Sequence, residues 1–158
     1  MKKIISIIGL FLFMASVNAQ SPVGKWKLVK GITQSKHGII TDVLKEDYQK
    51  QPCLANVIYS LTADGKIITD ADHCPDSTKK DLGVANLGIR WERPDYYNII
   101  ITTDDKDLEP LNYALTFCLN PDTRARCMIW ILHLKYDPYL DSGKPDEIAQ
   151  LVFTFHEL

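Results

Sequence analysis

The sequence predicts an all-β protein, a single up-and-down β-barrel of about eight antiparallel strands with one short helix. Two observations favour this fold class. Apolar and polar residues alternate with the two-residue period of half-buried strands along most of the chain. Turn signals rich in Gly, Pro, Asn and Asp separate these runs. A barrel closes such a meander and removes its edge strands, and a two-sheet sandwich is the alternative arrangement of the same strands.

The composition is that of an ordinary globular domain. The 158 residues are 46% hydrophobic and 24% charged, and the formal net charge is −2. These values argue against disorder, and the lack of a basic field argues against a nucleic-acid partner. The length suits one domain.

Residues 1–19 are predicted to be a cleaved signal peptide, which leaves residues 20–158 as the β-barrel domain. Lys2 and Lys3 precede an apolar run, and Val17-Asn18-Ala19 is a small-residue cleavage site. The run is too short to span a bilayer, and no later stretch approaches 18 apolar residues, so no membrane span is expected in the mature chain. We therefore expect an exported protein, either periplasmic or secreted.

The first part of the domain carries three strand signals and one helix signal. Strands are expected over residues 24–30, 56–62 and 66–69. Asp64-Gly65, the strongest short hairpin signal, joins the second strand to the third. A short helix is expected over 41–51, with Thr41 or Asp42 as its N-cap and Pro52 as its stop.

The second part of the domain carries five further strand signals. Strands are expected over residues 85–91, 97–101, 111–118, 127–136 and 149–155. Arg93-Pro94-Asp95 is a turn between the first two of these strands. The polar stretches 70–84 and 137–147 are expected to be irregular loops.

Four cysteines in an exported chain indicate disulfides. Sequence proximity favours Cys53–Cys74 and Cys118–Cys127 among the three connectivities. A hairpin about Asn120-Pro121-Asp122 that places Cys118 opposite Cys127 also aligns large apolar residues on one face, so the register and the second bridge agree. The aligned pairs are Phe117 with Met128, Leu115 with Trp130, and Tyr113 with Leu132. Zinc is disfavoured, since no Cys-x-x-Cys spacing occurs.

The motif Gly24-Lys25-Trp26, at the start of the first strand, resembles the lipocalin-like (calycin-type) domains of small exported bacterial proteins. The likeness continues through Cys53, Asp64-Gly65 and Cys74. It implies an eight-stranded barrel in which Gly24 and Trp26 are structural and the tryptophan packs across the closed base. Typical lipocalins also have an arginine near the chain end that covers this tryptophan, whereas the last arginine here is Arg126.

Aromatic side chains dominate the predicted interior of the barrel. The aromatic residues with inward parity are Trp26, Tyr59, Trp91, Tyr97, Tyr113, Phe117, Trp130, Phe153 and Phe155. The candidate ligand-binding residues among them are Tyr59, Trp91, Tyr97, Tyr113 and Trp130. Apolar walls with a few polar groups are typical of ligand sites, and buried tyrosine hydroxyls need partners. A filled core fits the same composition, because small barrels can be packed or hollow.

No catalytic residue, metal or cofactor is predicted. The sequence lacks a Gly-x-Ser-x-Gly motif, a phosphate-binding loop, a dinucleotide pattern and a His-Glu-x-x-His motif. Acidic clusters around His73 and over 104–109 carry enough charge for calcium but lack the EF-hand spacing, and solvated acidic loops are the ordinary alternative.

The sequence therefore favours an exported, non-enzymatic binding module that holds a small apolar or weakly polar ligand in the barrel interior. The alternative is a packed-core barrel that acts as a protein-interaction or accessory protein at the cell envelope. The interior distinguishes the two, because a ligand carrier needs a cavity and an accessory protein does not.

Overall fold

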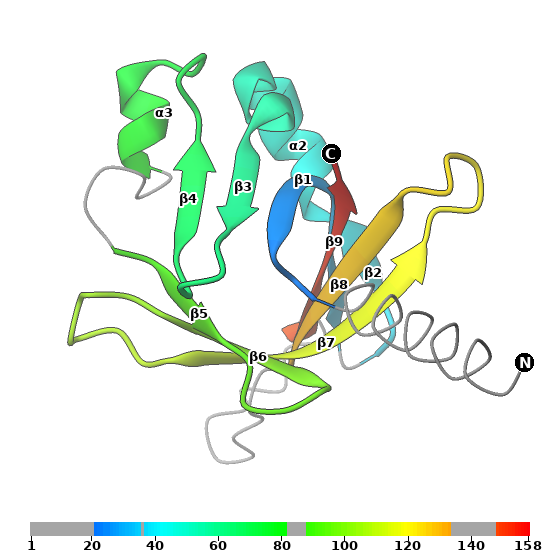
Figure 1. Ribbon diagram of the computed structural model, residues 1–158. Coiled ribbons are helices and arrows are strands. Elements are labelled where there is room, and N and C mark those ends of the chain that lie inside the picture. The colour runs from blue at the N-terminus through cyan, green and yellow to red at the C-terminus, as the bar shows by residue number, and fades with distance from the viewer. Residues whose placement is uncertain (1–20, 36, 82–87, 134–147) are drawn as a thin grey trace, which may run out of the picture.

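The computed structural model describes residues 21–35, 37–81, 88–133 and 148–158, which are mostly β-structure (Figure 1). The strands are β1 Gly24–Ser35, β2 Ile40–Asp42, β3 Ile58–Leu61, β4 Ile67–Asp70, β5 Arg90–Glu92, β6 Asn98–Thr102, β7 Leu111–Leu119, β8 Arg126–His133 and β9 Ile148–Glu157. The helices are α2 Val43–Lys50, the 3₁₀ helix η1 Pro52–Asn56 and α3 Asp76–Asp81. The predicted signal peptide lies outside the described residues.

The strands form one antiparallel sheet in the order β4-β3-β1-β9-β8-β7-β6-β5, with β2 paired to β1 off this path. With β2 left aside, neighbours in this row are also neighbours along the chain, except that the first and last strands, β1 and β9, pair with each other. The two ends of the row meet where Lys66 and Arg90 form an isolated bridge. The result is a nearly closed, eight-stranded up-and-down barrel with β2 as an addition, and this confirms the predicted all-β fold class.

Helix α2 forms where the capping signals predict it. The Asp42 carboxylate accepts hydrogen bonds from the backbone N–H groups of Leu44 at 3.1 Å and Lys45 at 3.2 Å, so Asp42 is the N-cap. The helix ends at Lys50, and Pro52 begins η1. In Figure 1, α2 and α3 lie on the same side of the molecule, beyond the ends of β3 and β4.

One loop prediction, one missed strand and one strand boundary need correction. The stretch 70–84 is not wholly irregular, because α3 occupies Asp76–Asp81. The acidic side chain of Asp76 stands in the first turn of α3, where it complements the helix dipole, and pairs with Lys79 at 3.6 Å. Strand β2 is an addition that the sequence pattern did not indicate. Strand β5 begins only at Arg90, whereas the predicted strand began at residue 85, and residues 85–87 of that strand lie outside the described residues.

Strand β1 runs beyond the predicted end at residue 30, because a β-bulge follows Leu28. Leu28 pairs with Phe155, Val29 is the extra residue of the bulge, and the register resumes with Lys30 opposite Thr154 and Gly31 opposite Phe153. The extra residue shifts the alternation by one position, so that even-numbered residues before the bulge and odd-numbered residues after it lie on the same face of the sheet. A sequence reading that assumes unbroken alternation stops the strand too early.

Trp26 is fully buried, as predicted, at the end of the barrel where β1 begins and β9 finishes. Its indole Nε1 donates to Pro22 O at 2.7 Å. Gly24 precedes it with φ +153°, a conformation that side chains disfavour, and a Cβ there would lie 3.4 Å from the Trp26 Nε1 atom. The guanidinium of Arg126 lies 5.4 Å from the centre of the Trp26 ring and forms two hydrogen bonds with the Glu157 carboxylate.

The predicted β7–β8 hairpin register is confirmed. Cys118 lies opposite Cys127, Phe117 opposite Met128 and Leu115 opposite Trp130. The buried core that these strands share with the rest of the barrel consists of Trp26, Leu61, Ile99, Tyr113, Leu115, Met128, Trp130 and Phe155. Binary alternation alone is enough to set this register, because a slip by one residue would turn every large apolar group outward.

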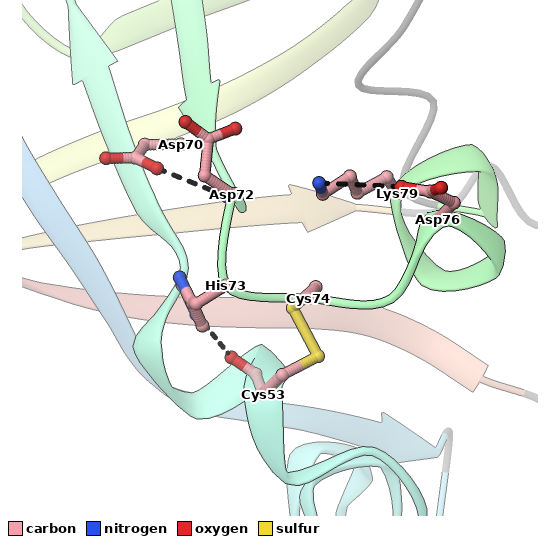
Figure 2. Close-up of a disulfide and its surroundings, with 7 residues drawn as sticks. All are labelled: Cys53, Asp70, Asp72, His73, Cys74, Asp76 and Lys79. Carbon is pink, nitrogen blue, oxygen red and sulfur yellow. Dashed lines mark hydrogen bonds and ion pairs between the residues drawn. A yellow bond between two sulfur atoms is a disulfide. The ribbon is translucent and has the colours of Figure 1, made fainter.

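The two cysteine pairs differ. Cys53 in η1 and Cys74 before α3 form the predicted disulfide, with their Cα atoms 5.3 Å apart (Figure 2). Cys118 and Cys127 are free thiols, so the second predicted disulfide is absent. In the same hairpin, Asn120 lies opposite Ala125, and the hydrogen bond from Asn120 N to Ala125 O makes these two residues a hydrogen-bonded pair. Because the two classes of pair alternate, Cys118 and Cys127 also form a hydrogen-bonded pair, in which side chains are farther apart than in the other class.

Candidate functional site

A cavity of about 220 Å³ lies inside the barrel and is partly open to solvent. Inward-facing side chains from most of the strands form its wall. The lining residues are Leu28, Tyr59, Leu61, Ile67, Thr69, Ile89, Ile101, Tyr113, Trp130, Phe153 and Phe155. None of these described residues carries a charge, so the wall is apolar apart from three hydroxyl groups and one indole N–H.

The period of the strands explains why these residues meet. Tyr59 lies opposite Thr69 and Leu61 opposite Ile67 in the β3–β4 pair. Trp130 lies opposite Phe153 in the β8–β9 pair. β3, β4 and β9 each contribute two wall residues that are two positions apart and project from one face of the sheet, and β8 contributes Trp130.

Four aromatic rings are packed against one another along the cavity wall. The ring centres of Trp130 and Phe155 are 4.9 Å apart, and those of Tyr113 and Trp130 are 5.5 Å apart. Tyr59 meets Phe155 edge to face at 6.0 Å. These tilted and edge-on arrangements are the favoured ones for aromatic pairs, so the wall is a well-packed surface rather than a loose group of rings.

One polar group of the cavity wall is buried without a hydrogen-bond partner among the described residues. The Nε1 atom of Trp130 is buried and makes no hydrogen bond in the described part of the chain. Burial raises the pKa of both Tyr59 and Tyr113, and no hydrogen bond contributes to either shift. Both phenols therefore stay protonated well above neutral pH. An unsatisfied buried donor costs about 1–3 kcal/mol, so its retention calls for an explanation.

Helix α2 borders the interior at the end away from Trp26. A Cβ added to Gly31 would lie 2.9 Å from Leu44 Cγ, so the glycine permits this close approach of the helix. The hydroxyl of Tyr48 donates to Leu28 O at 2.8 Å. Burial raises the pKa of Tyr48 to about 12, and the neighbouring Tyr59, Asp42 and Asp47 add to the shift.

Three of the five predicted ligand-binding residues line the cavity, namely Tyr59, Tyr113 and Trp130. Trp91 packs against the main core but does not line the cavity, and its Nε1 donates to Thr62 O at 3.2 Å. The inward placement of Tyr97 is wrong, because 71% of this residue is exposed.

A turn explains the position of Tyr97. The Asp95 carboxylate accepts a hydrogen bond from Tyr97 N at 2.7 Å and also binds the Asn98 side chain. This local turn holds Tyr97 outside β6, which begins at Asn98, and the ring packs on exposed Tyr96 instead. Ile99, fully buried, is the first residue of β6 to face the interior.

Sequence reasoning did not select the aliphatic and hydroxyl residues of the wall. Ile67 and Ile101 have the same inward parity as the aromatic residues, so the signal was present for them. Phe153 and Phe155 were assigned to the interior but not to the ligand-binding set. Thr69 is the polar exception, and only its position opposite Tyr59 identifies it. Parity indicates which face a residue occupies but does not tell how far along the barrel the packing leaves a void.

The acidic clusters have other partners. Asp70 accepts from Asp72 N at 3.3 Å, and His73 Nε2 lies 3.0 Å from Cys53 O, beside the disulfide (Figure 2). In the second cluster, Asp104 lies 3.7 Å from Arg90. Among the described residues, no group of three or more His, Cys, Asp or Glu side chains has the geometry to hold a metal ion.

Among the described residues, no helix is both long and apolar enough to cross a membrane. Comparisons with protein-family models, curated proteins and solved structures find no match for this chain.

Proposed function

We propose that this protein is an exported, non-enzymatic binding module that holds a small apolar or weakly polar molecule inside the barrel. The observation that carries the proposal is the partly open cavity of about 220 Å³ with an uncharged wall. A packed-core accessory protein has no use for such a void, since each cavity of this size costs stability through lost contacts.

The cavity volume limits the size of the ligand. An apolar cavity of about 150 Å³ is known to bind benzene, and drug-sized ligands occupy about 300–1,000 Å³. The present cavity falls between these values, so it suits a molecule of one or two rings better than a long acyl chain. The aromatic wall of Trp130, Phe155 and Tyr113 offers ring-to-ring contacts to such a molecule.

Three features support placing the chain with lipocalin-like barrels. The first and last strands, β1 and β9, pair with each other, and the Gly24-x-Trp26 motif lies at the start of β1. Arg126 covers the Trp26 ring, which is the role that the resemblance assigns to an arginine near the chain end. Export is supported by the leader-like first nineteen residues and by the Cys53–Cys74 disulfide, because disulfides persist in oxidising compartments.

Calorimetric titration with toluene tests the proposal, with palmitate as the size control. We expect saturable binding of toluene and none of palmitate. The variant Ile67→Phe fills the cavity and should weaken toluene binding at least tenfold, because Ile67 lines the wall. Its neighbour Ile68 is 54% exposed on the other face of β4, so Ile68→Phe is the matched control.

Ile101→Phe gives the same test from a different strand, in case the enlarged side chain on β4 disturbs folding. Absence of binding by the folded wild-type protein to every small ring compound would leave the packed-core accessory protein as the better account. Equal loss of binding in Ile67→Phe and Ile68→Phe would place the ligand elsewhere.

A further inference from the structure

We infer that the ligand of this cavity is a neutral ring compound with a hydrogen-bond acceptor, held by the Trp130 indole N–H and the Tyr113 hydroxyl. The inference rests on the proposed binding function and specifies its ligand class. The ligand class is inferred from the polar groups of the cavity wall, whereas the binding function is inferred from the presence of the cavity.

Trp130 supplies the first donor. The residue is 7% exposed, it lines the cavity, and its Nε1 has no partner in the described structure. An indole N–H can only donate, so whatever satisfies it must offer an acceptor. Trp26 and Trp91 show the ordinary arrangement, because each donates to a backbone carbonyl, of Pro22 and Thr62 respectively.

Tyr113 supplies a second donor on the same wall. Its ring centre is 5.5 Å from that of Trp130, and the residue is 8% exposed. Burial raises the pKa of its hydroxyl, and the protonated hydroxyl can donate a hydrogen bond. The Trp130 N–H without a partner and the Tyr113 hydroxyl on the same wall point to one acceptor atom, such as a carbonyl oxygen, because such an oxygen has two lone pairs.

The absence of charge on the wall restricts the ligand further. No lining residue can neutralise a carboxylate, a phosphate or an ammonium group, and burying an unpaired charge is far more costly than burying a carbonyl. Together with the volume, this favours a compact aryl ketone, aldehyde or ester over fatty acids and charged aromatic compounds.

The experiment compares acetophenone with α-methylstyrene, which replaces the carbonyl oxygen by a methylene group of nearly the same shape. Dissociation constants are measured by NMR titration for the wild-type chain, Tyr113→Phe, Trp130→Phe and the double variant. We expect the double variant to lose about tenfold in affinity for acetophenone and to bind α-methylstyrene within about twofold of wild type. Measuring both ligands on each protein cancels the difference in their hydration.

Trp91→Phe is the matched control, because it removes an indole that does not line the cavity. Tyr113→Phe deletes a single oxygen, so it keeps the test valid if replacement of Trp130 disturbs folding. Equal effects of the double variant on both ligands would overturn the acceptor inference and leave the binding function standing. Failure of both ligands to bind the wild-type chain would overturn the two together.

Discussion

Trp26 and Trp130 both point into the barrel, and the contrast between them separates its two halves. Trp26 is fully buried, its N–H is satisfied by Pro22 O, and Arg126 covers its ring. Trp130 borders a void, and its N–H has no partner among the described residues. Ile99, Leu115 and Met128 belong to the same core cluster as Trp26, and like Trp26 they are at most 4% exposed and do not line the cavity.

Two inward-facing tryptophans of one barrel can therefore have different roles, one in packing and one in binding. The half around Trp26 has the complete packing and satisfied polar groups that give stability. The half around Trp130 gives up contacts and leaves a donor without a partner, which is the usual signature of a binding site. Stability and binding are therefore expected to respond to mutations in different halves.

The largest expected effect is that of Trp26→Ala, which should lower the free energy of unfolding by about 3–5 kcal/mol. The change creates a cavity in the packed half and removes the partner of Arg126 and Pro22. Denaturant titration measures it, with Trp130→Phe as the comparison in the hollow half, where we expect a change below about 1.5 kcal/mol. Equal losses from the two variants would erase the proposed division of the barrel.

The two cysteine pairs give the next largest contrast. Replacing both Cys53 and Cys74 by serine should cost about 3 kcal/mol, because the bridge closes a loop with a sequence separation of 21. Cys118→Ser, at a half-exposed thiol, should cost less than about 1 kcal/mol. Thiol counting on the denatured, unreduced protein checks the assignment, and a result of no free thiols would show that the second bridge forms after all.

Arg126→Met should cost about 1–2 kcal/mol, because it breaks a partly buried, two-point pair with Glu157 and removes the cation above Trp26. Lys66→Met is the control. Lys66 pairs with Asp64 at 2.9 Å on the exposed hairpin turn, where such pairs contribute little. Urea unfolding of both variants measures the two losses of stability. An equal loss in Lys66→Met and Arg126→Met would contradict the prediction.

The smallest effect concerns alkaline pH. Tyr48 has a pKa raised to about 12 in the fold, whereas an unfolded tyrosine ionises near about 10. Its contribution to stability is therefore complete below about pH 10 and is lost as the pH rises to about 12. Between about pH 10 and 12, the free energy of unfolding should fall less steeply with pH in Tyr48→Phe than in wild type, and the difference in slope should correspond to at most about one bound proton. The control Tyr96→Phe, at an exposed tyrosine, should have the same slope as wild type. Parallel curves for all three proteins would contradict the shift.

Much of the barrel is predictable from sequence because its determinants are local. Asp42 and Pro52 mark the ends of the helix, and alternation aligns Leu115 with Trp130 across the hairpin. The bulge after Leu28 is not visible in the alternation. The turn at Asp95 is predicted, but its extension through Tyr97 is not, and this extension is the reason why Tyr97 points outward.

The candidate site is only partly predictable because a cavity is a property of packing. Tyr59, Tyr113 and Trp130 could be selected from parity and residue type. Trp91 has the same parity and type, but it finds the carbonyl of Thr62 and packs outside the void. The cover over Trp26 depends on Arg126, which is 100 positions away and meets it only through the closure of the barrel.

The most direct test of the two-halves account is a methyl NMR titration of isoleucine-labelled protein with toluene. Ile67, Ile89 and Ile101 line the cavity, Ile99 is fully buried in the core and does not line it, and Ile39 and Ile40 are exposed. We predict saturable ring-current shifts at the three cavity methyl groups and none at the packed or exposed ones. Shifts confined to Ile39 and Ile40, or no saturable shift at any isoleucine, would contradict the claim that half of this barrel is a binding cavity.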